Sequence, residues 1–224
     1  MKKATTILAL LLCVVLLIGA SVAGTLAFLT SRSTVTNTFT VGKVNLGDDG
    51  EAGLDEAKVN EYGEKLNASD GVWKEGETLA ARVTSNEYKL IPGHTYTKDP
   101  TVHVGANSEA CWLFVKVDNG IAAIEAATTT GADPYTKIAE QITGTQYGWT
   151  KLDGEENIYY KEAAKTGDDG VDYPVFGNFR LATNADVSGY ANANITVTAY
   201  AIQKDGLTVT DAWDALEAAY PSNP

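Results

Sequence analysis

The chain has 224 residues, a size that suits one globular domain, and its formal net charge is −12. A chain this acidic repels nucleic acid and anionic lipid, so neither is expected as a partner. The acidic residues are spread over many short segments and do not form one block, which argues against an acidic tail.

The first 27 residues have the layout of a cleavable signal peptide. A positive region at Lys2 and Lys3 precedes an apolar core over residues 7–18, and two sites with small residues follow at 21–23 and 25–27. The alternative is an uncleaved membrane anchor, because the stretch without charges is long enough to span a bilayer. Small residues lower its hydrophobicity where a span should continue, which favours cleavage. Without the leader the net charge is −14, since two lysines and no acid are lost.

Two cysteines are present, and only one belongs to the expected mature protein. Cys13 lies in the leader, so Cys111 has no partner for an intramolecular disulfide after cleavage. Cys111 begins the apolar run Cys111–Val115, and we therefore expect a buried small side chain and not a reactive thiol.

Residues 28–46 are predicted to form an N-terminal strand that can act as a donor strand. Four threonines at positions 34, 36, 38 and 40 lie on one face of it, and apolar side chains lie on the other. A strand at a newly cut chain end has pairing partners only where the fold or another molecule supplies a sheet edge. The segment that we expect to assemble consists of Val35, Thr36, Asn37, Thr38, Phe39, Thr40 and Val41.

The next part of the chain is rich in turns. Residues 54–62 fit a short helix and a surface strand about equally well. Residues 82–91 are predicted to be extended and to end at Pro92-Gly93, a turn signature. Residues 95–104 are predicted to form a strand interrupted by Pro100, which indicates an edge or a bulge.

An apolar run at residues 110–117 predicts a central strand, and the later elements are mostly short. Helices are expected at 121–127, 135–142 and 210–220, the last with Trp213, Leu216 and Tyr220 on one stripe. Strands are expected at 148–152, 158–161, 173–176, 179–181 and 194–203, with Gly and Asp turns between them. Many short strands and few helices predict a mainly β fold, an antiparallel, jelly-roll-like β-sandwich that spans residues 28–224.

Catalytic and cofactor motifs are not found in the sequence. Zinc proteolysis needs closely spaced histidines with a glutamate as base, whereas His94 and His103 are nine residues apart and fit surface or turn positions. No serine has a nucleophile-elbow setting, and no Gly-rich phosphate loop follows a strand. Residues 168–172 contain three aspartates that could bind Ca²⁺ weakly, but they do not match the helix–loop–helix calcium motif. We expect no cofactor.

Five short motifs resemble the TasA/camelysin family of secreted proteins from Gram-positive bacteria. They are residues 24–30 (GTLAFLT), 35–42 (VTNTFTVG), 88–94 (YKLIPGH), 98–102 (KDPTV) and 199–203 (AYAIQ). The resemblance covers both ends of the mature chain and is weaker in the middle. It implies processing by a SipW-type signal peptidase, with cleavage between Ala27 and Phe28.

The sequence thus favours a secreted structural protein of the extracellular or biofilm matrix or of the cell surface. We expect head-to-tail strand addition to build fibres, with itself and with other matrix proteins as partners and no membrane attachment after cleavage. Two alternatives remain. One is a camelysin-like surface metalloendopeptidase, which the resemblance implies. The other is a monomeric adhesive or ligand-binding sandwich that keeps its own N-terminal strand.

Overall fold

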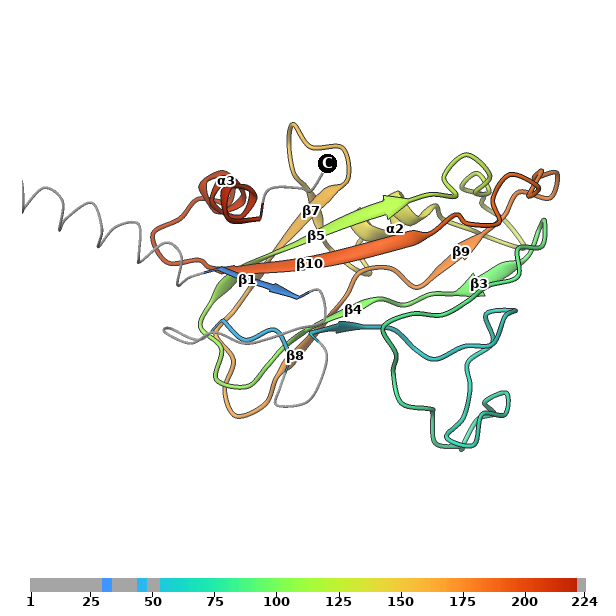
Figure 1. Cartoon of the computed structure of the whole chain (residues 1–224), viewed down its shortest axis with the longest axis horizontal. Coiled ribbons are helices and arrows are strands. Elements are labelled where there is room, and N and C mark those ends of the chain that lie inside the picture. Colours follow the sequence, from blue (N-terminus) through green and yellow to red (C-terminus); the bar gives the residue numbers. More distant parts are fainter. Residues whose placement is uncertain (1–29, 34–43, 48–52, 221–224) are drawn as a thin grey trace, which may run out of the picture.

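A computed structural model describes residues 30–33, 44–47 and 53–220 of the chain (Figure 1). Within these ranges the protein is mainly β, with antiparallel strands and two helices. The strands are β1 (Thr30–Ser33), β2 (Leu54–Asp55), β3 (Thr95–Thr97), β4 (Thr101–Val104), β5 (Cys111–Asn119), β6 (Thr150–Lys151), β7 (Ile158–Ala163), β8 (Val171–Pro174), β9 (Asn178–Arg180) and β10 (Ile195–Gln203). The helices are α2 (Ile138–Thr143) and α3 (Val209–Ala219).

The strands form three sheets among the described residues. The largest has the order β1-β10-β5-β7-β6, the second has the order β2-β4-β8, and β3 pairs with β9 alone. The predicted central strand is confirmed, because β5 lies between β10 and β7 and pairs with β10 along all nine residues. This long pair is the centre of the fold.

Both faces of the five-stranded sheet are covered, as the alternation of apolar residues along β5 and β10 requires. On one face Leu113 and Val115 of β5 share a core with Val102 and Val104 of β4. On the other face Phe114 packs with helix α3. Figure 1 accordingly shows α3 on one side of β5 and β10, and β4 with β8 on the opposite side.

Helix α3 forms where the sequence predicts it. Thr208 caps its N-terminus by accepting the backbone N–H of Asp211, whose carboxylate in turn accepts from the Thr208 N–H, so two backbone donors are satisfied. Leu216 is fully buried, and the predicted stripe packs on the sheet with Trp213 and Tyr220 beside it. The helix thus covers the face of the sheet that does not touch the smaller sheets.

Pro100 separates two strands that belong to different sheets. β3 pairs with β9 and β4 pairs with β8, so the chain changes sheets at the proline. Proline has no N–H to donate, but its carbonyl accepts the backbone N–H of Val175 at 2.9 Å. The predicted interruption is confirmed, and the turn at Pro92-Gly93 is confirmed by a Gly93 φ of +78°.

Two helix predictions differ from the structure. Residues 121–124 form a turn instead of a helix, because Glu125 bridges to Leu181 and the next N–H donates to the Arg180 carbonyl. The helix expected over 135–142 begins only at Ile138, because Tyr135 bridges to Thr129. Residues 54–62, which fit a helix and a strand about equally well in sequence, contain β2 and isolated bridges, in agreement with the strand alternative. In each case pairing with distant backbone outweighs local helix propensity.

No helix in the described ranges is both long and apolar enough to span a membrane. The leader, residues 1–27, lies outside those ranges, as does most of the predicted N-terminal strand.

Candidate functional site

The candidate site lies at the β1 edge of the five-stranded sheet. β1 is the edge strand and pairs antiparallel with β10, from Thr30 opposite Ile202 to Ser33 opposite Ala199. β10 continues beyond this pair toward Ile195. Among the described residues, no strand pairs with residues 195–198 on the β1 side, although β5 pairs with them on the other. Within the described ranges, the pairing of residues 195–198 is therefore with β5 alone.

A groove of about 1250 Å³ lies beside this part of β10. Ile195 and Val197 line it, together with the preceding loop that carries Tyr190. The opposite wall is the extended segment 84–90, which contributes Tyr88. The groove mixes apolar and amide side chains, so it offers pockets to side chains as well as backbone groups to a strand.

Tyr88 is held in place by the aromatic core beneath the groove. Its ring packs edge-on against Tyr96 and Phe179, and its hydroxyl donates to the Thr97 carbonyl at 3.0 Å. Burial raises the pKa of the Tyr88 phenol above its ordinary value, and the negative charges of Glu56 and Asp99 add to the effect. The phenol is therefore neutral at physiological pH and serves as a hydrogen-bond donor.

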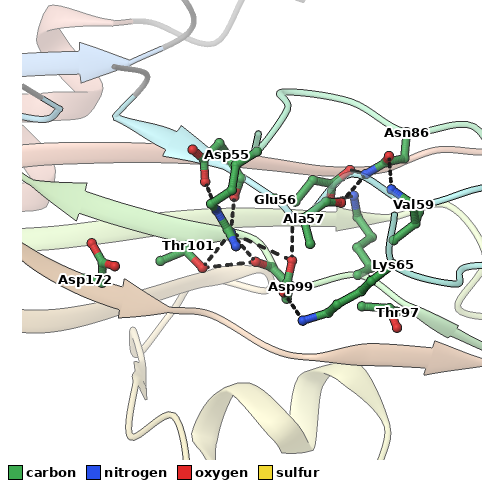
Figure 2. A network of polar contacts seen from close by, with 12 residues as sticks. Asp55, Glu56, Ala57, Val59, Lys65, Asn86, Thr97, Asp99, Thr101 and Asp172 are labelled. Atoms are coloured by element: carbon green, nitrogen blue, oxygen red, sulfur yellow. Dashed lines mark hydrogen bonds and ion pairs between the residues drawn. The ribbon is translucent and has the colours of Figure 1, made fainter. Parts of the chain in front are cut away.

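Polar contacts fix the segment 82–90 against the residues that flank β2 and β4 (Figure 2). Asp99 accepts the backbone N–H of Ala57 at 2.7 Å and pairs with Lys65 at 3.2 Å. Arg82 donates to the Asp55 carboxylate and, at 3.0 Å, to the Thr101 hydroxyl. The bonds of Arg82 thus join the start of the segment 82–90 to β2 and β4, which are distant in the sequence.

The network also contains a buried ion pair, formed by Lys98 and Glu56. Lys98 Nζ lies 2.6 Å from Glu56 Oε2, and the exposed fractions of the two side chains are 11% and 5%. The other oxygen of Glu56 accepts from Asn86 Nδ2 at 2.9 Å. All three residues line the groove. A buried carboxylate with two such partners has its hydrogen-bonding capacity met from both sides.

His103 joins all three strands of the second sheet. It lies in β4, with Nδ1 2.6 Å from Asp172 of β8 and Nε2 2.8 Å from Asp55 of β2. Burial lowers the pKa of the imidazole, but hydrogen bonds and charge interactions with both aspartates outweigh burial, and the net shift is upward. The two carboxylates therefore favour the doubly protonated ring, a cation that ties the sheet together.

Some of the expected site residues lie inside the described ranges and others lie outside them. Ala27, Phe28 and the assembly segment Val35–Val41 lie outside them, whereas four residues of the predicted N-terminal strand, Thr30–Ser33, form β1 and pair within their own chain. Cys111 is fully buried, as expected, and burial raises the pKa of its thiol to about 12.

The two histidines have separate partners, and of the aspartates considered as calcium ligands Asp172 contacts His103. His94 contacts the Tyr62 carbonyl at 2.8 Å, whereas His103 is occupied by aspartates. Asp172, from the calcium candidate 168–172, is one of these partners. The described residues contain no group of three or more His, Cys, Asp or Glu side chains placed to hold a metal ion.

The Glu56, Lys98 and Asn86 cluster was missed by sequence reasoning. These residues are distant in the sequence and match no motif, so no local signal identifies them. Comparisons with protein-family models, curated proteins and solved structures gave no match for this chain. The site is therefore interpreted from its own geometry.

Proposed function

We propose that this protein is a secreted structural component of the extracellular or biofilm matrix that assembles into fibres by strand addition. The observation that supports this most directly is the edge of β10 that faces β1. Within the described ranges β1 pairs with Ala199–Ile202, and Ile195, Thr196 and Val197 of the same strand line a groove. An incoming strand would gain backbone hydrogen bonds from β10 and side-chain contacts from the groove.

The register of β1 specifies how such a strand would lie. Ser33 is opposite Ala199, so a strand that continues in this register brings Val35 opposite Val197 and Asn37 opposite Ile195. These are the first residues of the segment expected to assemble. In a fibre the strand of one subunit occupies the edge of the next, in place of that subunit's own strand. Such an exchange is head-to-tail and propagates as an open filament.

The proposed architecture and processing agree with this mechanism. We propose that the sheets that face each other across the core form one jelly-roll-like sandwich over residues 28–224. A SipW-type signal peptidase removes residues 1–27, which releases the protein from the membrane and leaves β1 close to the new N-terminus. A strand near a free end can leave its own sheet without threading a loop.

The second candidate function is a monomeric adhesive or ligand-binding protein. The groove supports this candidate, because aromatic and amide side chains, among them Tyr88, Tyr190 and Asn86, line it. In that case the N-terminal strand completes its own sheet and stays there. The two candidates predict different behaviour as the protein concentration rises: a matrix component forms fibres, whereas an adhesive or ligand-binding protein stays monomeric.

Electron microscopy of the mature protein at increasing concentration tests the proposal. The mature chain should form fibres, whereas a chain that lacks residues 28–41 should remain soluble and folded without forming them. Thr150→Lys, in the edge strand β6 at the other end of the sheet, is a matched control and should assemble normally. Fibres from the truncated chain would contradict strand addition. Complete unfolding of the truncated chain would also contradict it, because the N-terminal strand would then be needed for the fold of its own subunit.

A further inference from the structure

Three side chains in the floor of the groove are arranged for a reaction with one another. Lys98 Nζ and Asn86 Nδ2 contact the two oxygens of one carboxylate, that of Glu56, at 2.6 and 2.9 Å. Glu56 is 4% exposed, and the Lys98 side chain is 11% exposed. A primary amine and a carboxamide are thus held on the two oxygens of one mostly buried carboxylate.

The surroundings of Asn86 also suit attack on its amide carbon. The backbone N–H of Val59 donates to Asn86 Oδ1 at 2.9 Å, and Nδ2 donates to the Ala57 carbonyl at 2.9 Å. These partners fix the orientation of the amide, because Oδ1 needs a donor and Nδ2 needs acceptors. The Val59 N–H lies where negative charge develops when a nucleophile adds to the carbonyl.

We propose that Lys98 and Asn86 form an intramolecular isopeptide bond, with Glu56 as the acid–base catalyst. Glu56 accepts a proton from the Lys98 ammonium, and the neutral amine attacks Asn86 Cγ. The Nζ–Cγ bond forms, the Cγ–Nδ2 bond breaks, and Nδ2 leaves as ammonium, because it receives one proton from Glu56 and one from the attacking Lys98 nitrogen. No oxidant or reductant is needed, and Glu56 returns to its starting state.

Each part of the cluster has a role that this reaction requires. The exposed fractions of 11% and 5% limit the access of bulk water to the Lys98 amine and the Glu56 carboxylate. The Glu56 carboxylate binds both the amine and the amide. The two groups therefore need no diffusional encounter, and a rotation about the Lys98 side-chain torsions brings the amine to the amide carbon. The nearby pair of Lys65 and Asp99 has a lysine and a carboxylate at 3.2 Å but no carboxamide, so it cannot react in this way.

The bond would join two segments that are otherwise held by non-covalent contacts. Asn86 lies in the extended wall of the groove, and Lys98 lies between β3 and β4. A covalent link closes the intervening loop permanently, so the wall of the groove stays attached when the rest of the domain loosens. This suits an extracellular protein whose described residues contain one cysteine and no disulfide.

Mass spectrometry of the purified mature protein tests the proposal. Its intact mass, compared with that expected from its sequenced N-terminus, should be lower by one ammonia. Proteolysis should release a branched peptide that contains both Lys98 and Asn86. Lys98→Arg keeps the positive charge for Glu56 but removes the nucleophile, so its mass should match its sequence. Glu56→Gln should also keep the full mass, whereas Lys65→Arg, the matched control, should still lose ammonia.

Two results would overturn the proposal. One is an intact mass equal to that of the unmodified sequence after prolonged incubation of the folded protein. The other is an ammonia loss that persists in Lys98→Arg, because an asparagine that cyclises alone also loses ammonia. The Lys98→Arg and Lys65→Arg proteins should both be folded by circular dichroism, so that a missing bond in one of them reports chemistry and not misfolding.

Discussion

His103 and Asp172 lie directly opposite each other in the antiparallel pair of β4 and β8, with the imidazole Nδ1 2.6 Å from a carboxylate oxygen. The other ring nitrogen contacts Asp55, which also binds Arg82. The imidazole thus joins β4 to both of its neighbours, and its protonation controls the strength of that connection. It supplies the first prediction.

His103→Gln should destabilise the protein by about 1 kcal/mol at low pH and by less at high pH. The pKa of His103 is raised in the folded state, so its stabilisation is fully present below the pKa of a free histidine, about 6.5, and is lost as the pH rises through the higher folded value. Urea unfolding from about pH 5.5 to 9 measures this difference. His94→Gln is the control, because His94 contacts a neutral carbonyl. A difference that grows with pH would contradict the assignment.

The second prediction concerns processing of the leader. The small residues Thr25 and Ala27, the loss of hydrophobicity after residue 18 and the resemblance to the TasA/camelysin family together predict a cut after Ala27, so N-terminal sequencing of the secreted protein should begin at Phe28. A start at Gly24 would indicate an ordinary signal peptidase. An intact Met1 would place the protein among membrane-anchored proteins.

The third prediction concerns the strand that is proposed to assemble. Phe39→Asp should abolish fibre formation while the domain stays folded, because an unpaired charge in an apolar pocket costs several kcal/mol, on the order of the docking free energy itself. Sedimentation and electron microscopy measure assembly. Thr38→Asp, on the opposite face of the strand, should have the smaller effect. Equal fibre yields from wild type and Phe39→Asp would show that this side chain does not contact the neighbouring subunit.

The fourth prediction concerns the thiol of Cys111. Because its pKa is raised to about 12, only about one thiol in ten thousand is ionised near pH 8, and the side chain is also inaccessible. An alkylating reagent should therefore modify Cys111 only after the protein is unfolded in guanidinium. Peptide mapping identifies the labelled residue. Rapid labelling of the native protein would mean that the start of β5 opens frequently.

The fifth prediction separates the structural role from a camelysin-like protease. Both ring nitrogens of His103 are engaged by aspartates, and His94 contacts a backbone carbonyl, so zinc would have to displace these partners. The purified mature protein should not cleave casein in the presence of zinc. Proteolysis that chelator removes and zinc restores would support the enzymatic alternative instead.

The sequence by itself determined the elements whose signal is local. Apolar runs and alternation predicted β5 and β10, and the spacing of Trp213, Leu216 and Tyr220 predicted α3. Turn residues predicted the change of direction at Pro92-Gly93. These features depend on side-chain periodicity and on backbone preferences within a few residues, both of which can be read from the chain directly.

Only the tertiary structure decided how these elements combine. Residues 121–124 turn because Glu125 pairs with Leu181, and no local pattern reports a partner more than fifty residues away. The same holds for Glu56, which meets Asn86 and Lys98 at distances of 30 and 42 residues in the sequence. The physical reason is that hydrogen bonds and ion pairs of buried polar groups are satisfied in space, by whichever segments the packed core brings together.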